Sequence, residues 1–177
     1  MRYLVLFTFV FLITIYSFSS SPKNSNNEMA GGDSLDIKIG QMIMMGIHDR
    51  KFLSENDTLI DELRYKIGGI ILFEKNVAPE NSFEKLKKLI ADLKTKSTTP
   101  LFMAIDEEGG KVHRLKEKYG FVSMPSAEYL GKLSSTDSTF FYAERLAKEL
   151  FELGFNLNFA PDVDVAINAE NPIIAKA

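Results

Sequence analysis

The chain has 177 residues, of which 45% are hydrophobic and 25% are charged, a composition typical of a folded globular protein. Its formal net charge of −3 argues against a partner such as nucleic acid, which basic proteins bind by neutralising phosphates. The sequence has no cysteine and two histidines, His48 and His113. These counts exclude disulfides, thiolate metal ligands, a cysteine nucleophile and a lipid-modified cysteine, and they argue against a multi-histidine metal site.

Residues 1–21 form an apolar N-terminal segment with the pattern of a secretory signal peptide. Arg2 gives a positive start, residues 3–18 are almost continuously apolar, and serines follow at the expected cleavage point. The alternative is an uncleaved membrane anchor, but this run of about 16 residues is shorter than the ~20 that span a bilayer. We therefore expect an exported protein, periplasmic or secreted, with no membrane attachment after cleavage and no lipidated cysteine.

Residues 22–35 are rich in Asn, Ser and Gly and predict a flexible linker, so the folded part is expected at residues 36–177. Residues 36–45 predict a short helix that runs into a strand. Residues 58–67 carry apolar side chains at helical spacing, which predicts a helix capped at its N-terminus by Asn56 or Asp57.

Three short apolar runs predict buried strands, at residues 68–73, 101–106 and 155–159. Two longer amphipathic segments predict helices at residues 79–96 and 136–153. The buried face of the second of these helices is predicted to hold Phe140, Ala143, Ala147, Leu150 and Phe151.

Apolar strands that alternate with amphipathic helices indicate a parallel α/β architecture. Two folds satisfy this pattern, a doubly wound open sheet and a TIM (β/α)8 barrel. A complete barrel takes about 250 residues. The sequence pattern therefore leaves open either a small open sheet or the N-terminal half of a barrel.

Functional groups in parallel α/β folds gather at the carboxyl ends of the strands. The segment DEEGGKVHR at residues 106–114 lies at such an end, with Asp106 directly after a predicted strand. Three adjacent carboxylates are costly to bury together, and the paired glycines permit a sharp turn. The pattern fits a solvated turn with acids at the next helix N-terminus, or a site where Asp106 recognises the hydroxyl groups of a sugar.

A second strand end lies at residues 159–174, where Asp162 and Asp164 either cap a loop or line the pocket. The sequence has no glycine-rich phosphate loop, zinc-protease motif or serine-hydrolase elbow, so we expect no cofactor and no metal. His48 is predicted to lie on a surface loop. His113 lacks a third group that would mark it as a catalytic base.

The segment IDEEGGKVHRL at residues 105–115 resembles the signature I-D-x-E-G-G-x-V-x-R-L of glycoside hydrolase family 3. Further segments resemble the family in the same order along the chain, namely IGQMIMMG (39–46), IGGIILFEKNV (67–77), MPSAEYLG (124–131), LGFNLNFAPDVDV (153–165) and ENPII (170–174). The resemblance covers residues 36–177 and is strongest to the bacterial β-N-acetylglucosaminidases.

The resemblance implies a TIM (β/α)8 barrel, a retaining mechanism and a β-glycoside substrate. The β-glycosides expected include those that contain N-acetylglucosamine. In the family, the aspartate of the signature binds hydroxyls of the sugar in the −1 subsite, a role that falls to Asp106. Glu107 occupies a position that varies between Gln and Glu. Residues that match the motifs and are expected to shape the loop or support the site are Glu107, Glu108, Gly109, Gly110, Arg114 and Asp164.

The family's later motifs have no match in this sequence. They include an arginine segment that binds sugar, the loop with the histidine acid/base and the strand with the nucleophilic aspartate. We therefore expect an N-terminal fragment of a glycosidase, with no catalytic residue of its own and no turnover. The alternatives are a non-catalytic sugar-binding module, a β-glucosidase-type specificity in the longer protein, and an unrelated small open-sheet protein.

Overall fold

The computed structural model describes residues 35–64, 67–164, 167–168 and 170. The predicted signal peptide at residues 1–21 lies outside the described residues, as does the predicted linker except for its last residue. The first helix, α1, spans Leu35–Gln41 and is followed by strand β1 at Met44–Gly46. The prediction of a short helix that runs into a strand is therefore confirmed.

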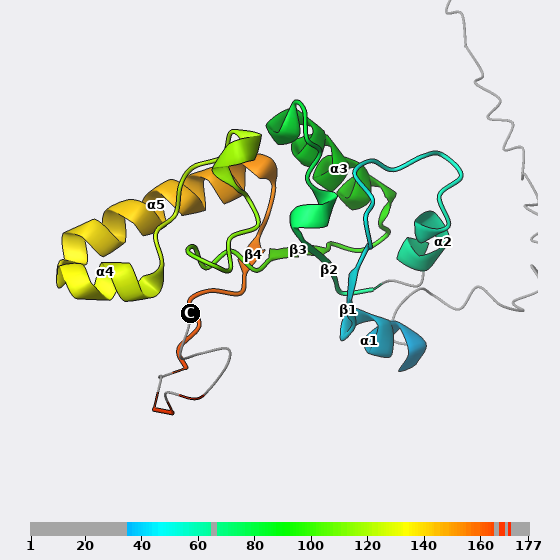
Figure 1. Ribbon diagram of the computed structural model, residues 1–177. Helices are drawn as coiled ribbons and strands as arrows, with labels where there is room; N and C mark the ends of the chain where they lie inside the picture. The colour runs from blue at the N-terminus through cyan, green and yellow to red at the C-terminus, as the bar shows by residue number, and fades with distance from the viewer. Residues whose placement is uncertain (1–34, 65–66, 165–166, 169, 171–177) are drawn as a thin grey trace, which may run out of the picture. The chain divides into compact units, whose positions relative to one another are not determined.

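Four parallel strands form one sheet (Figure 1), with β2 at Gly69–Leu72, β3 at Phe102–Ile105 and β4 at Leu157–Asn158. The strands lie side by side in the order β1-β2-β3-β4, which is also their order in the chain. A doubly wound sheet reverses its strand order at a switch point, whereas a barrel adds each strand next to the last. The four described strands therefore follow the arrangement of a barrel.

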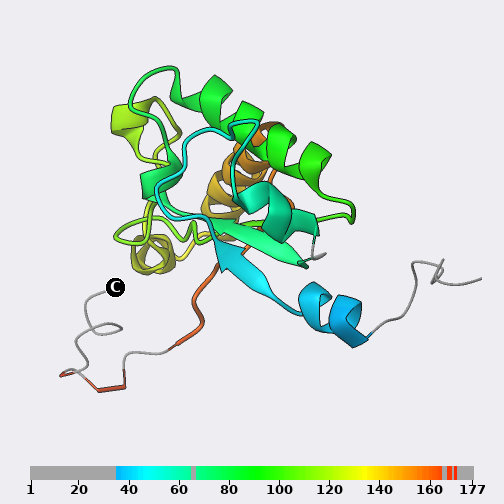
Figure 2. The ribbon, with the colours of Figure 1, turned by 90° about the vertical axis from the view of Figure 1, so that its right-hand side faces the viewer.

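Five helices accompany the described part of the sheet. Besides α1 they are α2 (Leu59–Arg64), α3 (Ser82–Lys96), α4 (Ala127–Leu133) and α5 (Thr136–Leu153). Figure 2 shows α2 and α3 over the same face of the sheet, and α3 also contacts α5. Two short 3-10 helices, η1 (Glu74–Asn76) and η2 (Glu117–Tyr119), lie in the loops after β2 and β3.

The core lies between the sheet and these helices. Strand residues alternate between the two faces of the sheet, so Ile70 and Leu72 of β2 and Met103 and Ile105 of β3 point toward the helices and are almost fully buried. They pack with buried side chains of the helices, which include Leu59, Leu63, Leu86, Leu89, Ile90, Leu93, Leu146, Leu150 and Leu153. This packing fixes the strand ends and hence the loops that follow them.

Most predicted elements agree with the structure to within a few residues. Asp57 Oδ1 accepts the backbone N–H of Leu59 at 3.0 Å, so the predicted aspartate cap of α2 is confirmed. Helix α5 has the predicted bounds, because the Ser135 hydroxyl accepts the Ser138 N–H at 3.2 Å at one end and Gly154 caps the other. Helix α4 was not predicted from the sequence.

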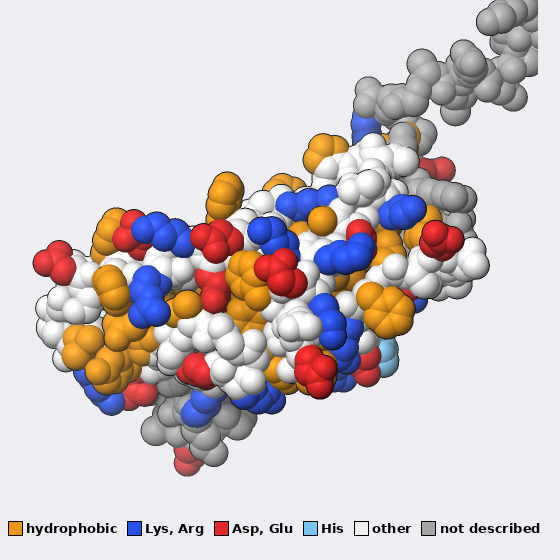
Figure 3. Space-filling view, turned by 90° about the horizontal axis from the view of Figure 1, so that it is seen from above, with side chains coloured by type: hydrophobic (Ala, Val, Ile, Leu, Met, Phe, Trp, Pro, Cys, Tyr) orange, Lys and Arg blue, Asp and Glu red, His pale blue; other side chains and the backbone are white. Residues whose placement is uncertain are grey.

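The predicted buried face of α5 was wrong in part. Leu150 is buried, but Phe140 and Phe151 are 69% and 80% exposed, and Ala143 and Ala147 are exposed as well. The buried residues Leu146, Leu150 and Leu153 follow i, i+4, i+7 spacing, and the two phenylalanines lie to one side of that stripe. On the face turned upward in Figure 1, hydrophobic side chains are exposed among Lys, Arg, Asp and Glu (Figure 3).

Candidate functional site

Asp106 follows β3 directly and stands at the carboxyl end of the sheet. Its Oδ2 atom binds the Arg114 guanidinium, with Nη2 at 2.5 Å, and the two side chains are each 27% exposed. The Arg114 guanidinium also lies over the ring of Phe73, 5.7 Å from its centre, at the end of β2. A half-buried carboxylate is thus held by a cation and an aromatic ring that come from two neighbouring strand ends.

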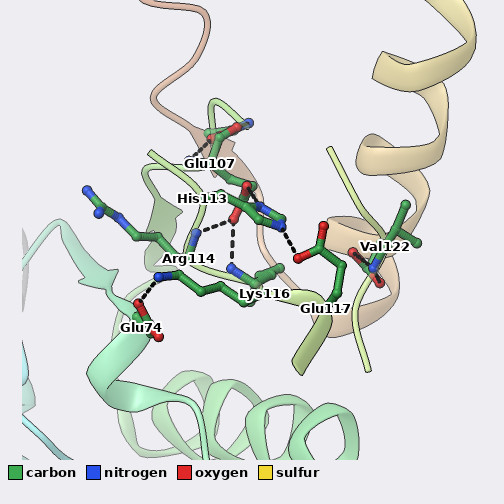
Figure 4. A network of polar contacts seen from close by, with 10 residues as sticks. Glu74, Glu107, His113, Arg114, Lys116, Glu117 and Val122 are labelled. Atoms are coloured by element: carbon green, nitrogen blue, oxygen red, sulfur yellow. Dashed lines mark hydrogen bonds and ion pairs between the residues drawn. The ribbon is translucent and has the colours of Figure 1, made fainter. Parts of the chain in front are cut away.

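Glu107 points to the opposite side of the same loop and is fully buried. Its Oε2 atom accepts the backbone N–H groups of Arg114 and Leu115, at 2.8 and 2.9 Å. Its Oε1 atom contacts Nδ1 of His113, which is also buried (Figure 4). Every oxygen of this buried carboxylate has a partner, which is the condition for keeping such a group inside a protein.

The paired glycines make a tight turn between Glu107 and His113. Gly109 and Gly110 have φ angles of +85° and +57°, which side chains rarely adopt. A Cβ on Gly109 would lie 2.4 Å from the carbonyl oxygen of Pro125, and one on Gly110 would lie 2.6 Å from Cβ of Ser126. The segment before α4 therefore packs directly on the glycine turn, and no larger residue fits there.

Two asparagines of β4 and its flank bind the backbone of β3 and the following loop. Asn158 Oδ1 accepts the Glu107 N–H at 3.0 Å, and its Nδ2 donates to the Glu107 carbonyl at 3.0 Å. Asn156 binds the N–H of Met103 and the carbonyl of Leu101 in the same manner, at 2.7 and 3.0 Å. The short strand β4 is thereby joined to β3 by side chains as well as by backbone bonds.

Glu108 faces an apolar cavity of about 520 Å³ that is also lined by Met124, Leu130, Leu146 and Pro161. Burial raises the pKa of the Glu108 carboxyl, the negative charges of Asp106 and Asp162 raise it further, and Arg114 opposes them. The structure thus brings Asp162 into the electrostatic neighbourhood of the acidic loop.

The remaining predicted residues lie farther from this centre. Asp164 is exposed, and its backbone N–H donates to Asp162 Oδ1 at 2.8 Å, which makes a local turn. His48 has an 81% exposed side chain 3.6 Å from Asp49, in agreement with the predicted surface loop. Within the described residues no cluster of acidic and histidine side chains is suited to a metal ion, and no helix is long and apolar enough to cross a membrane.

Glu74 is a residue of this region that the sequence reasoning missed. It lies two residues after the end of β2, in a strand-end loop like the one that holds Asp106, so the rule that selected Asp106 applied to it as well. Its carboxylate binds Lys116 at 2.9 Å and Lys118 at 2.8 Å, and it accepts the Tyr119 hydroxyl at 3.2 Å. These contacts connect the loop after β2 to the loop after β3.

The hydrogen bonds from Lys116 and Lys118 lower the pKa of Glu74 to about 2. A lowered pKa stabilises the fold above the ordinary value of 4.5, and this contribution is lost as the pH falls toward about 2. We expect Glu74→Gln to lower the free energy of unfolding at pH 7 by about 1 kcal/mol, the scale of an exposed ion-pair network. Urea titrations at pH 7 and pH 2.5 measure the difference, which should shrink at the lower pH.

The matched control for this measurement is Glu80→Gln, at an exposed position in the loop before α3. It should leave the unfolding midpoint unchanged at both pH values. A pH-independent loss in Glu74→Gln would contradict the electrostatic explanation.

The sequence family described as "Glycosyl hydrolase family 3 N terminal domain" matches residues 34–177. The chain belongs to glycosyl hydrolase family 3. The resemblance of the acidic loop and its flanking segments to this family is therefore confirmed, and the unrelated open-sheet alternative is excluded.

Curated relatives of this family 3 chain are β-hexosaminidases. It is 39% identical over 122 residues to Beta-hexosaminidase A of Pseudoalteromonas piscicida, a match that covers 63% of this chain and 19% of the relative. It is 37% identical over 103 residues to the Beta-hexosaminidase of Idiomarina loihiensis, with 56% and 30% covered. The family 3 chain thus spans less than a third of the length of these relatives.

Solved structures agree with the fold. A family 3 β-N-acetylglucosaminidase from Paenibacillus sp. matches with a TM-score of 0.72 and 33% identity, over 81% of this chain and 27% of that one. Native NagZ from Neisseria gonorrhoeae matches with a TM-score of 0.54 and 34% identity, over 67% and 35%. The four described strands therefore belong to the N-terminal part of the family's TIM barrel, which settles the choice that the sequence pattern left open.

Proposed function

We propose that this family 3 chain is the sugar-binding N-terminal part of a retaining β-N-acetylhexosaminidase, with Asp106 as the residue that binds sugar hydroxyls. The proposal rests on how the two oxygens of the Asp106 carboxylate are hydrogen-bonded. Arg114 binds its Oδ2 atom and keeps it in place, while Oδ1 accepts no hydrogen bond from the described residues. A carboxyl oxygen without such a partner, on a side chain that is 27% exposed at a strand end, is suited to accept a ligand hydroxyl.

The names of the relatives, β-hexosaminidase and β-N-acetylglucosaminidase, support the proposed specificity for N-acetylglucosaminides. Retaining hydrolysis needs a nucleophile and an acid/base on opposite sides of the anomeric carbon. We assign neither role to this chain, because Asp106 is bound by Arg114 on one oxygen and has the hydroxyl-binding position in the family signature. Both reacting groups would come from the part of the barrel that follows the described strands.

We also propose that the protein is exported. The support is the pattern of residues 1–21, where a positive start precedes an apolar run and a group of serines. Mass spectrometry of the protein recovered from the periplasm or medium tests this proposal. An N-terminus within the serine group or the following linker supports cleavage, and recovery of intact residues 1–21 in the membrane fraction contradicts it.

The function is tested with Asp106→Asn in the protein expressed from its complete reading frame. Hydrolysis of a nitrophenyl N-acetyl-β-glucosaminide is measured beside hydrolysis of the corresponding β-glucoside. We expect the variant to lose about 10- to 100-fold in kcat/KM on the preferred substrate, because a charge-assisted hydrogen bond contributes ~1.5–3 kcal/mol.

The control variant is Asp137→Asn, an exposed aspartate in the first turn of α5. It should keep the wild-type kcat/KM, and the 177-residue chain alone should give no hydrolysis. An Asp106→Asn variant with wild-type activity would contradict the sugar-binding role. Turnover by the 177-residue chain would contradict our placement of both reacting groups outside it.

A further inference from the structure

Glu107 and His113 form a buried polar pair directly behind the Asp106 carboxylate. The Glu107 side chain is 0% exposed and the His113 side chain is 7% exposed. A buried polar pair is often no more stabilising than an apolar pair of the same volume. The arrangement of the Glu107–His113 hydrogen bond therefore matters more than the contribution of the pair to core stability.

The carboxylate of Glu107 is hydrogen-bonded to the loop segment that carries Arg114. Its Oε2 atom accepts the N–H groups of Arg114 and Leu115, and Leu115 is itself anchored in the core with no exposed surface. Arg114 in turn reaches back to Oδ2 of Asp106, the neighbour of Glu107. Asp106 is thus held from both sides, through the chain to Glu107 and through the guanidinium of Arg114.

His113 sets the orientation of the Glu107 carboxylate. Its Nδ1 atom contacts Oε1, and we take Nδ1 as the donor of this hydrogen bond because a carboxylate oxygen accepts. Oε2 is then left to accept the two backbone N–H groups (Figure 4). The other ring nitrogen, Nε2, is buried without a hydrogen-bond partner among the described residues and lies 3.8 Å from the Glu117 carboxylate. The bond that matters for the loop is therefore the one from Nδ1.

We propose that Glu107 and His113 are positioning residues that hold Arg114 on Oδ2 of Asp106 and so keep Oδ1 aimed at the sugar. This inference rests on the proposed glycosidase function and adds to it the source of the geometry of Asp106. Neither Glu107 nor His113 touches the sugar in this arrangement. Both act through Arg114 and the loop backbone.

Two substitutions at His113 separate positioning from packing. The amide nitrogen of Asn takes the place of Nδ1, so His113→Asn keeps a donor for Glu107, whereas the longer Gln places its amide near Nε2 and loses that donor. In the protein from the complete reading frame, we expect His113→Gln to lose about tenfold or more in kcat/KM, as misplaced binding groups do. We expect His113→Asn to stay close to the wild type.

A second measurement reads the pair directly, by ring nitrogen NMR of the 15N-labelled 177-residue chain. The chain has two histidines, and exposed His48 serves as the internal reference. In the wild type we expect a protonated Nδ1 on His113. In Glu107→Gln the amide oxygen takes over the two backbone bonds and its NH2 group faces Nδ1, so we expect the Nδ1 proton to be lost.

The outcomes distinguish this proposal from the proposed function. Loss of kcat/KM in His113→Gln but not in His113→Asn, at matched thermal stability, supports the positioning role. Equal kcat/KM in the two variants, or an unprotonated Nδ1 in the wild type, overturns it while wild-type hydrolysis leaves the glycosidase function intact. Absence of hydrolysis in the wild-type protein overturns both.

Discussion

Gly109→Ala is expected to lower the free energy of unfolding by about 3 kcal/mol, the sum of a left-handed backbone for a residue with a Cβ and a steric overlap. The φ angle of Gly109 is +85°, and its Cβ would lie 2.4 Å from the backbone oxygen of Pro125. Because backbone cannot rotate away as a side chain can, the loop itself must move. In the protein from the complete reading frame, we therefore expect the proposed sugar hydrolysis to be lost together with stability.

The matched control is Gly120→Ala. Gly120 has nearly the same φ angle, +87°, but a Cβ there would have no atom within 4 Å among the described neighbours. It should cost about 1–2 kcal/mol, the backbone part alone. Urea unfolding of both variants isolates the overlap with Pro125, and equal losses in the two variants would contradict the proposed close packing of this turn.

Asn158→Ala is expected to have the second large effect, a loss of about 2–4 kcal/mol in the free energy of unfolding. The substitution leaves the N–H and the carbonyl of buried Glu107 without their partners. An unsatisfied buried polar group costs roughly 1–3 kcal/mol. Since Glu107 precedes the glycine turn and directly follows Asp106, the loop that presents Asp106 loses its support at the same time.

Asn156→Ala provides the comparison for this variant. Asn156 makes the same pair of bonds, to Met103 and Leu101, at the other end of β3. The two variants should lose similar stability, as read by the urea midpoint. In the protein from the complete reading frame, the proposed hydrolysis per folded molecule should fall in Asn158→Ala and remain in Asn156→Ala. A parallel loss of hydrolysis in both would mean that Asn158 acts on the sheet and not on the loop.

Much of the secondary structure was predictable because its signals are local. The bounds of α5 follow from Ser135, Gly154 and the periodic apolar residues between them, all of which are near neighbours in the chain. Strands β2 and β3 were predicted from short apolar runs that are bounded by turn-forming or charged residues. Helix α4 escaped prediction because it buries only Leu130 and contains Gly131, so no apolar stripe marks it in the sequence.

The site was predictable in part. The strand-end rule selected Asp106 and the glycine turn, since both are adjacent in sequence to an apolar strand. It did not reveal that Glu107 and His113 are buried against each other, because three consecutive carboxylates read most simply as a solvated turn. Glu107 is buried only because Arg114, Leu115 and His113 fold back to supply its partners.

The 177 residues determined by themselves that this is an α/β chain without cysteine chemistry and with an acidic strand-end loop of the family 3 type. Composition, periodicity and motif order are properties of the sequence itself and do not depend on which distant residues are in contact. Apolar periodicity alone did not separate an open sheet from a barrel, but the family resemblance implied the barrel and the strand order confirmed it. The exposure of Phe140 and Phe151 and the pairing of Asp106 with Arg114 were decided by tertiary structure. Each depends on which distant segments share a sheet edge or a helix face, and that is fixed only when the whole core packs.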